Sequence, residues 1–240
     1  MQVYWLEQIE GDVSPGNDWL SASEAACQHV LRFAKRRADW RLGRWTAKRA
    51  VSTYLNLPAH PLAFANVEIR AEASGAPEAF VDARPAALTI SLSHRDGRAI
   101  CAVAPIGVEL GCDLEVVEPR SDAFLSDYFA AEEQALVARE PAAAQPRLVT
   151  LLWSAKESTL KALHTGLRLD TRSVIVSPES SFDVCGWSPV QARCSADRIF
   201  HGWWRQTENI MRTLVASRPP TTPIPLKLSA YLTNPASQCT

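Results

Sequence analysis

The sequence lacks two features that would assign the chain to a class at once. It has no strong net charge, because 25 Lys and Arg residues are balanced by 26 Asp and Glu residues. We therefore expect no general attraction to nucleic acid or to an anionic membrane, so any anion must bind through a local cluster. It also lacks any uninterrupted apolar stretch near the ~20 residues that cross a bilayer. With 240 residues, 47% of them hydrophobic, it is predicted to be an ordinary folded protein without nucleic-acid or membrane partners.

An organised set of cysteines is also missing. The six cysteines form no Cys-x-x-Cys pair and have no histidine at the spacing of zinc ligands, so they are predicted to be reduced packing residues. The first ten residues, MQVYWLEQIE, carry acids where a secretory signal peptide needs a basic and then an apolar run. We expect a cytoplasmic protein.

Helical patterns occupy the first quarter of the chain. Ser21 and Glu24 have the spacing of a capping box, and a helical pattern runs from there toward Arg37. A second pattern continues through Leu55 and stops before Pro58. The sequence predicts two helices, or one interrupted helix, in this stretch.

Strand patterns follow. Residues 61–87 contain three prolines and are predicted to be loops with short strands such as Val67–Ala71. From Leu88 to Ser93 apolar and polar residues alternate, and the run at 99–104 follows the turn sequence RDGR. This pattern predicts a hairpin. A further strand is predicted at 108–116, with apolar residues on one face and acids on the other.

The rest of the chain contains two helical patterns, more strands and a tail. Phe124–Arg139 and Arg147–His164 are predicted to be helices, separated by PAAAQP. The run SVIVSP and the later Trp-rich segments suggest strands. The tail after Ser217 is rich in proline and is predicted to wrap the surface without regular structure.

Asp113 and Glu115 are the first candidate site. They lie two residues apart on the predicted strand 108–116, so their side chains project from one face about 6–7 Å apart. Two like charges at that spacing repel each other unless a cation or a proton lies between them. A solvated strand face is one interpretation, and a site for a hard cation such as Mg²⁺ is the other.

The stretch LLWSAKESTLKAL supplies a third carboxylate. Trp153, Glu157 and Lys161 recur every four residues and so share one stripe of a helix, with Lys156 adjacent. A simple Glu–Lys pair on a wet surface would contribute ~0.3–0.5 kcal/mol. The alternative is a wall of an active site, because carboxylates and cations together suit phosphoryl chemistry.

Two further groups could contact phosphate. His94 lies at the end of a predicted strand, next to Ser93, and is either a structural histidine or a phosphate-binding or acid–base group. The basic run at 35–49 is either a solvated helix face or a phosphate grip. In the second case Arg36 and Arg37 would act with forked guanidinium donors.

Taken together, these motifs resemble a known family. GCDLE at 111–115 resembles its G-x-D-x-E motif, WSAKESTLK at 153–161 its W-x-x-K-E-x-x-x-K motif, and SLSHRDG at 91–97 its S-H-S-type element. The family is the two-lobed, Sfp-type class of 4′-phosphopantetheinyl transferases, and the resemblance covers roughly residues 30–175. The loop Gly75–Ala76–Pro77 has alanine where the family often has a basic residue.

The resemblance implies a fold and an activity. The fold would be α+β, a monomeric pseudo-dimer of two similar α/β lobes with the active site in the seam. Its parts would be an N-terminal lobe at 1–105, a C-terminal lobe at 106–217 and a proline-rich tail at 218–240. The activity would be Mg²⁺-dependent transfer of 4′-phosphopantetheine from coenzyme A to a serine of an apo acyl or peptidyl carrier protein, with release of 3′,5′-ADP. The pathway, whether fatty acid, polyketide or non-ribosomal peptide synthesis, stays open.

The resemblance also implies three sets of site residues. The Mg²⁺ ligands would be the carboxylates Asp113, Glu115 and Glu157. The groups that contact coenzyme A would be Arg36 and Arg37 at the 3′-phosphate, with Ser93, His94, Lys156 and Lys161 at other phosphate oxygens. The catalytic groups would be Glu157, Lys161 and His94, with Glu157 acting as a metal ligand and as the base, directly or through a metal-bound water.

Two other functions compete with this interpretation. A Mg²⁺-dependent phosphodiesterase or nuclease would use the same acids but needs a further acidic or histidine-rich cluster for a second metal. A non-catalytic nucleic-acid-binding module would use the basic helix at 35–49, and it would leave the acidic strand and the WSAKESTLK pattern unexplained.

Overall fold

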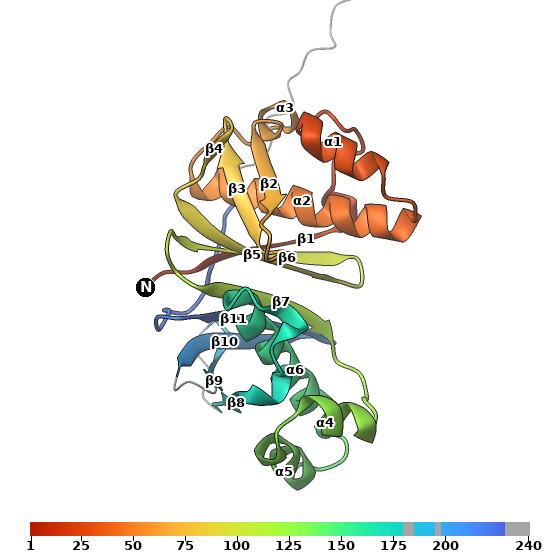
Figure 1. Ribbon diagram of the computed structural model, residues 1–240, viewed down its shortest axis with the longest axis vertical. Helices are drawn as coiled ribbons and strands as arrows, with labels where there is room; N and C mark the ends of the chain where they lie inside the picture. Colours follow the sequence, from red (N-terminus) through yellow and green to blue (C-terminus); the bar gives the residue numbers. More distant parts are fainter. Residues whose placement is uncertain (180–184, 195–197, 229–240) are drawn as a thin grey trace, which may run out of the picture.

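The computed structural model describes residues 1–179, 185–194 and 198–228 and has an α+β fold. Two β-sheets face each other, and a long helix covers the outer side of each (Figure 1). No helix in these parts of the chain is long and apolar enough to cross a membrane. The elements from β1 to β6 form the first half of the molecule, and those from β7 to β11 form the second.

The first half is built on a four-stranded sheet with the order β12-β1-β6-β5 and a smaller sheet with the order β2-β3-β4. Its elements are β1 (Tyr4–Ile9), α1 (Ala22–His29), α2 (Ala34–Tyr54), α3 (Pro61–Phe64), β2 (Val67–Ala71), β3 (Pro77–Val81), β4 (Arg84–Pro85), β5 (Leu88–Arg95) and β6 (Arg98–Pro105). The helix α2 buries Ala47, Ala50 and Val51 against this sheet. A 3-10 turn at Glu10–Asp12 follows β1.

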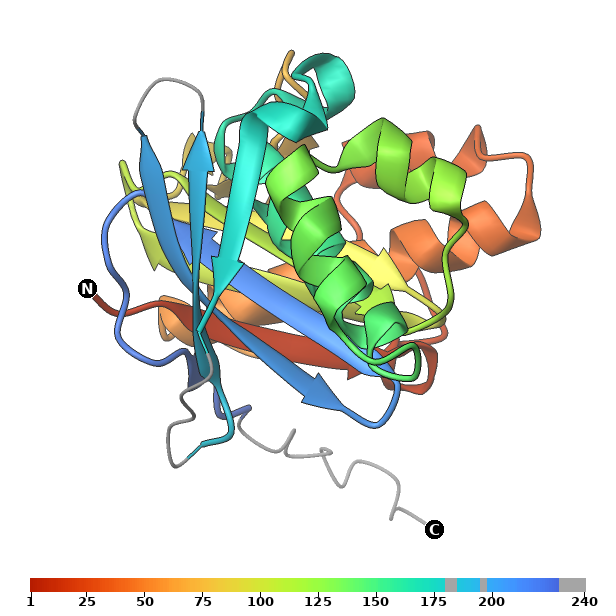
Figure 2. The same ribbon diagram turned by 90° about the horizontal axis from the view of Figure 1, so that it is seen from below.

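The second half is a five-stranded sheet with the order β7-β11-β10-β9-β8. Its elements are β7 (Leu110–Val116), α4 (Asp122–Tyr128), α5 (Ala131–Arg139), α6 (Gln145–Ala162), β8 (Val174–Pro178), β9 (Ser188–Cys194), β10 (Ile199–Thr207) and β11 (Ile210–Ala216), with 3-10 turns at Gly166–Arg168 and Thr171–Ser173. Leu152 and Ala155 of α6 are buried in the core on this side of the sheet. Figure 2 views the molecule from this side, with the helices of the second half in front of its sheet.

An apolar layer joins the two sheets. Ile100 and Ala102 of β6 face Leu114 of β7 and Leu214 of β11, all of them at most 2% exposed. These residues alternate with others that face the covering helices, as the two-residue period of a strand requires. The layer extends from one half to the other, so the halves share a core.

The two halves repeat one plan. The strand order β1-β6-β5 of the first sheet matches β7-β11-β10 of the second, and a short and a long helix precede the second strand of each series. The long helices carry matching sequences, Trp45-Thr-Ala-Lys48 in α2 and Trp153-Ser-Ala-Lys156 in α6. This sequence repeat is only four residues long, so it does not stand out in the sequence alone.

The same buried ion pair occurs in each half. Lys48 is fully buried against Glu24 of α1, and Lys156 is fully buried against Glu133 of α5. Each lysine also donates to two backbone carbonyls, and each glutamate accepts from the backbone N–H of a strand residue. Each pair therefore fastens a short helix, a long helix and an outer strand together.

Several predicted elements are confirmed. The capping box of Ser21 and Glu24 begins α1, and β2 has the predicted bounds. The predicted hairpin forms from β5 and β6, with Asp96 and Gly97 as its two-residue turn. Both turn residues have positive φ, at 50° and 70°, which the tight hairpin turn requires.

Other elements differ from the prediction. The pattern toward Arg37 breaks at 30–33, so α1 ends at His29 and α2 begins at Ala34. The predicted helix over 124–139 is two helices, because Glu133 caps the backbone N–H of Ala130 and starts a new one there. The tail, predicted to lack regular structure, contributes the two-residue strand β12 (Ile224–Pro225), which pairs parallel with β1. A proline can occupy such an edge because it needs no N–H there. Residues 229–240 of the tail, including Cys239, lie outside the described residues.

Candidate active site

The two acids of β7 lie against α6. The apolar positions of β7 face the layer between the sheets, so Asp113 and Glu115 point to the opposite side, toward the helix. Gly111 shares their face, and a Cβ there would lie 1.7 Å from the carbonyl oxygen of Ser158 in α6. Only glycine allows the helix to pack this closely, and the close packing brings the helix side chains to the acids.

Asp113 connects three elements. Its Oδ1 accepts hydrogen bonds from Lys161 Nζ of α6 at 2.7 Å and from Ser93 Oγ of β5 at 2.8 Å. Lys161 Nζ also donates to the carbonyl of Cys112 at 3.0 Å. Asp113 is 4% exposed, and within the described residues its Oδ2 has no hydrogen-bond partner. One buried carboxylate oxygen is therefore available to a ligand.

Glu115 is surrounded by donors of several kinds. Trp153 Nε1 donates to its Oε1 at 3.3 Å, and Arg95 and Arg120 lie 3.5 and 3.6 Å from its Oε2. Burial raises the pKa of Glu115, the charge of Asp113 raises it further, and the two guanidinium groups oppose the shift. The buried Oε2 forms no hydrogen bond in the described parts of the chain, so it too can accept a ligand.

Lys161 pairs with Asp113 and not with Glu157. The helical salt bridge between Glu157 and Lys161, one of the two interpretations of this stretch, is therefore not formed, and among the described residues the Glu157 carboxylate has no hydrogen bond or ion pair. Burial raises the pKa of Glu157, the charges of Asp113 and Glu115 add to the shift, and Lys161 opposes it. Burial alone would lower the pKa of Lys161, but the negative charges of Asp113 and Glu157 outweigh it and raise the pKa. The surroundings therefore favour the charged form of Lys161 and disfavour the charged form of Glu157.

The acids fit a divalent cation in part. Carboxylate oxygens are the ligands that Mg²⁺ prefers, together with water and phosphate oxygens. Asp113 Oδ2 and Glu115 Oε2, which accept no hydrogen bond in the described chain, suit such an ion, although two arginines also lie near the glutamate oxygen. However, no three His, Cys, Asp or Glu side chains in the described ranges form a group that could hold a metal. The predicted set of three carboxylates that includes Glu157 is thus not assembled in the structure, whereas the two acids of β7 each have a carboxylate oxygen that could bind a metal ion.

His94 lies beside a recess of about 370 Å³ near the start of α2. The recess is lined by Phe33, Lys35, Arg36, Asp39, Trp40 and His94. Partial burial lowers the pKa of His94, and Lys161 lowers it further, against the opposing charge of Asp39. The neutral imidazole of His94 is therefore favoured, and in that form it can donate one hydrogen bond.

The structure brings Arg36 to His94 but does not bring Arg37 there. Arg37 Nη1 donates to the carbonyls of Leu31 at 2.7 Å and Arg32 at 3.1 Å, at a different recess. Neighbouring residues of a helix point about 100° apart, so the two guanidinium groups do not act on one phosphate. The prediction that they grip it together is not supported by their positions.

The prediction that Lys156 contacts phosphate is wrong. Its side chain is fully buried, pairs with Glu133 at 2.7 Å, and donates to the carbonyls of Thr171 and Val174. It precedes Glu157 in α6 and so points away from β7, into the second half. Its role in the structure is to fasten helices.

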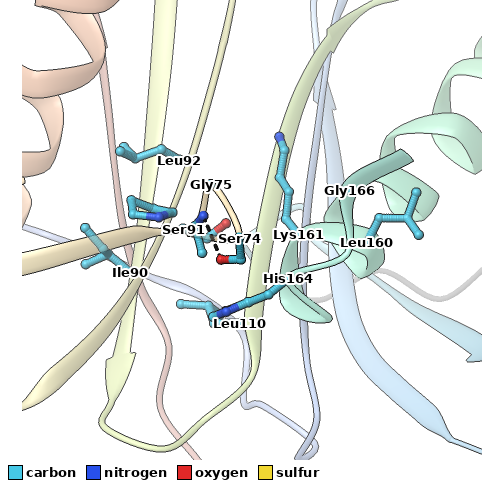
Figure 3. Close-up of a pocket in the computed structure, with 12 residues that line it drawn as sticks. Ser74, Gly75, Ile90, Ser91, Leu92, Leu110, Leu160, Lys161, His164 and Gly166 are labelled. Carbon is cyan, nitrogen blue, oxygen red and sulfur yellow. Dashed lines mark hydrogen bonds between the residues drawn. The ribbon is translucent and has the colours of Figure 1, made fainter. Parts of the chain in front are cut away.

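A seam pocket of about 220 Å³ lies next to Lys161 (Figure 3). Its lining comes from both halves, and includes the Ser74–Pro77 loop, residues 90–92 of β5, Leu110 of β7, and Leu160, Lys161 and His164 from α6 and its C-terminal end. Ser91 and His164 line this pocket but are not among the predicted site residues. The strand alternation places Ser91 on the same face as Ser93, which could have indicated it. In the structure its Oγ accepts a hydrogen bond from Cys112 N at 3.0 Å.

The basic run at 35–49 does not form one solvated face. Arg41 donates to the carbonyls of Ser14 at 2.7 Å and Gly16 at 2.8 Å, and Lys48 is buried. Arg44 lies 3.9 Å from Glu24. Much of this charge therefore holds the first half together and is not presented to a polyanion.

Comparison with known proteins supports one family. Residues 109–204 match the model of the 4′-phosphopantetheinyl transferase superfamily, and this segment contains β7 and α6. No curated protein matches the chain. Among solved structures, the holo-[acyl-carrier-protein] synthase of Thermotoga maritima matches with 18% identity and a TM-score of 0.36, over 45% of this chain and 61% of that chain. That structural likeness is too weak to support an assignment.

Proposed function

We propose that the protein transfers 4′-phosphopantetheine from coenzyme A to a serine of an apo carrier protein, because residues 109–204 match the model of the 4′-phosphopantetheinyl transferase superfamily. The transfer would release 3′,5′-ADP. The carrier would be an acyl or peptidyl carrier protein, and the enzyme would act as a cytoplasmic monomer whose two halves form one site.

One observation supports this proposal above the others. Asp113 lies at the junction of β5, β7 and α6, where a serine from the first half and a lysine from the second meet one carboxylate oxygen. The other oxygen is buried and without a partner in the described chain. A site that needs both halves, and that combines acids with a charged lysine, suits the transfer of a phosphoryl group from a pyrophosphate.

Each side chain then has a task in the reaction. Attack by a serine hydroxyl on the β-phosphate requires removal of the hydroxyl proton and stabilisation of the pyrophosphate charge. Glu157 would take the proton, because its pKa is raised and its carboxylate has no partner among the described residues. Lys161 would donate to phosphate oxygens while Asp113 keeps it charged. A Mg²⁺ ion held by Asp113 and Glu115 would supply further positive charge.

The other end of coenzyme A would extend toward α2. Ser93 and His94 are next to each other at the end of β5, and Arg36 lines the recess beside His94. We assign the 3′-phosphate to Arg36 and not to Arg37, whose guanidinium donates to backbone carbonyls. Neutral His94 can donate a hydrogen bond to a phosphate oxygen.

The test is mass spectrometry of carrier proteins. The purified protein is incubated with coenzyme A, Mg²⁺ and a panel of apo acyl and peptidyl carriers, and at least one carrier should gain a phosphopantetheine mass as 3′,5′-ADP appears. Asp113→Asn and omission of Mg²⁺ should each abolish the gain, whereas Glu118→Gln, a change to a nearby exposed carboxylate, should not. Cleavage of coenzyme A without any gain of mass would indicate a phosphodiesterase instead.

A further inference from the structure

A second cleft lies between the two sheets. It has a volume of about 330 Å³ and opens between β1 and β6 on one side and β10 and β11 on the other. Five charged side chains contribute to its lining: Glu7, Asp12, Arg98, Arg205 and Arg212. None of these residues has a part in the transfer proposed above.

The internal repeat relates this cleft to the candidate active site. At that site the first half contributes β5 and the second contributes β7, and in the repeat β10 corresponds to β5 while β1 corresponds to β7. The hairpins fix the register, because Arg95–Arg98 and Thr207–Ile210 are the innermost pairs around two-residue turns. Counting from these pairs, Arg205 takes the position of Ser93. The second cleft is thus the counterpart, in the internal repeat, of the candidate active site.

The residues at the corresponding positions have changed their chemistry. Gln8 is the second residue from the end of β1, and Glu115 is the second from the end of β7, so these two positions correspond. The shared Trp-x-x-Lys sequence of the long helices likewise aligns Arg49 with Glu157. The three acidic positions of the candidate active site therefore correspond to one apolar, one amide and one basic residue: Leu6, Gln8 and Arg49. The cleft keeps two carboxylates of its own, but Glu7 is paired with arginines and Asp12 accepts from a backbone N–H.

The charges in the cleft are unevenly paired. Glu7 accepts from Arg212 Nη2 at 2.7 Å and from Arg98 Nη1 at 3.4 Å, and Arg98 Nη2 also lies 3.9 Å from the exposed Glu208. Asp12 accepts from the backbone N–H of Ile9 at 2.9 Å. Arg205 is half-buried and makes no ion pair or hydrogen bond within the described residues. Trp5 also lines the cleft, and its Nε1 is buried without a hydrogen-bond partner in the same residues.

We propose that this second cleft binds a phosphate group without a metal ion. Arg205 would supply the main charge-assisted hydrogen bonds, Arg98 would add a second positive charge, and the indole N–H of Trp5 would be a neutral donor. Guanidinium groups suit a phosphate because their forked donors match two of its oxygens. The cleft is larger than a free phosphate, so a phosphate monoester fits as well as the free ion.

Two tryptophans allow binding at each of the two sites to be measured separately. Trp5 reports on the second cleft, and Trp153, which donates to Glu115, reports on the candidate active site. Indole N–H signals are followed by NMR while inorganic phosphate is added, and the two are assigned with Trp5→Phe and Trp153→Phe. We expect the Trp5 signal to shift and saturate without Mg²⁺. A parallel titration with adenosine 3′-monophosphate shows whether the cleft prefers an ester.

Substitution of Arg205 decides the question. In Arg205→Gln the affinity seen at Trp5 should fall about tenfold or more, as loss of a charge-assisted hydrogen bond predicts. Arg193→Gln removes an exposed arginine of β9 and should leave the titration unchanged. Arg205 lies outside the proposed catalytic groups, so both variants should still transfer phosphopantetheine. A Trp5 signal that does not move, or that responds equally in the two variants, would overturn the proposal.

Discussion

Lys161 contacts Asp113, and not the glutamate one turn before it on the same helix. The spacing of Glu157 and Lys161 predicts a helical salt bridge, but Gly111 brings α6 so close to β7 that the buried Asp113 becomes the nearer partner. Glu157 is left partly buried and without a partner in the described chain. A residue in this state contributes little to stability and is available for chemistry.

A single substitution separates these roles for Glu157. Glu157→Gln keeps the shape of the side chain but cannot accept the serine proton, so single-turnover transfer should fall on the order of 10²-fold or more. The melting temperature should stay constant or rise, because the raised pKa shows that the fold disfavours the charged form. Glu132→Gln, at an exposed glutamate of α5, is the matched control and should change neither quantity. Full turnover in Glu157→Gln would remove this residue from catalysis.

The two neighbouring arginines of α2 give a second contrast. Arg36→Ala should lower the affinity for coenzyme A about tenfold or more and leave the affinity for 3′-dephospho-coenzyme A unchanged, because charge-assisted hydrogen bonds contribute about 1.5–3 kcal/mol each. Arg37→Ala should affect both ligands alike and only slightly, since its guanidinium donates to Leu31 and Arg32. Calorimetric titration of both ligands into both variants measures this. The reverse result would assign the 3′-phosphate to Arg37.

At the scale of secondary-structure elements, the sequence predicted the features that depend on the local pattern of apolar and polar residues. Alternation located the β5–β6 hairpin and placed Asp113 and Glu115 on one face of β7. The break between α4 and α5 was not predicted, because Ala130 at the start of α5 has no capping side chain of its own and is capped by Glu133 instead. The burial of Lys156 was not predicted either, because periodicity shows which face of a helix a residue occupies but not that Glu133, 23 residues away, would pair with it.

The buried pair also makes a prediction about pH. Glu133→Gln leaves the Lys156 ammonium buried without its counter-ion, which should destabilise the protein by about 3–5 kcal/mol at neutral pH. Burial lowers the pKa of Lys156 already, and removal of Glu133, which opposes that shift, should lower it further. The unfolded chain then binds more protons than the folded one, so stability rises with pH between the lowered pKa and the ordinary value of 10.5.

Chemical denaturation at several pH values tests this. The difference in unfolding free energy between the wild type and Glu133→Gln should shrink as the pH is raised toward 10. Glu24→Gln, which removes the partner of Lys48 in the first half, is the matched variant and should behave in the same way. A constant difference across the range would show that the lysine stays charged, or that the loss arises only from the hydrogen bonds of the glutamate.

At the scale of the whole molecule, the shared apolar layer decides how the halves behave. Ile100 on the first sheet and Leu214 on the second are buried only because each sheet covers the other. Separate halves would expose this layer to water, at a cost of about 25 cal/mol for each Å² of apolar surface. The ion pair of Glu7 with Arg212 and the pairing of β12 with β1 add further links between distant parts of the chain. We therefore expect the two halves to unfold as one unit.

A change deep in one half tests this coupling. Leu152 is fully buried between α6 and the second sheet, away from the first half, and Leu152→Ala should destabilise the protein by about 2–5 kcal/mol. If the halves form one unit, the denaturation midpoint should fall equally for amides of α6 and for amides of α2, as read by hydrogen exchange across a denaturant series. Val51→Ala in α2, at the corresponding depth of the first half, should shift both helices in the same way. A midpoint that moves only in the substituted half would show that the halves unfold independently, and that the layer between the sheets contributes little to their stability.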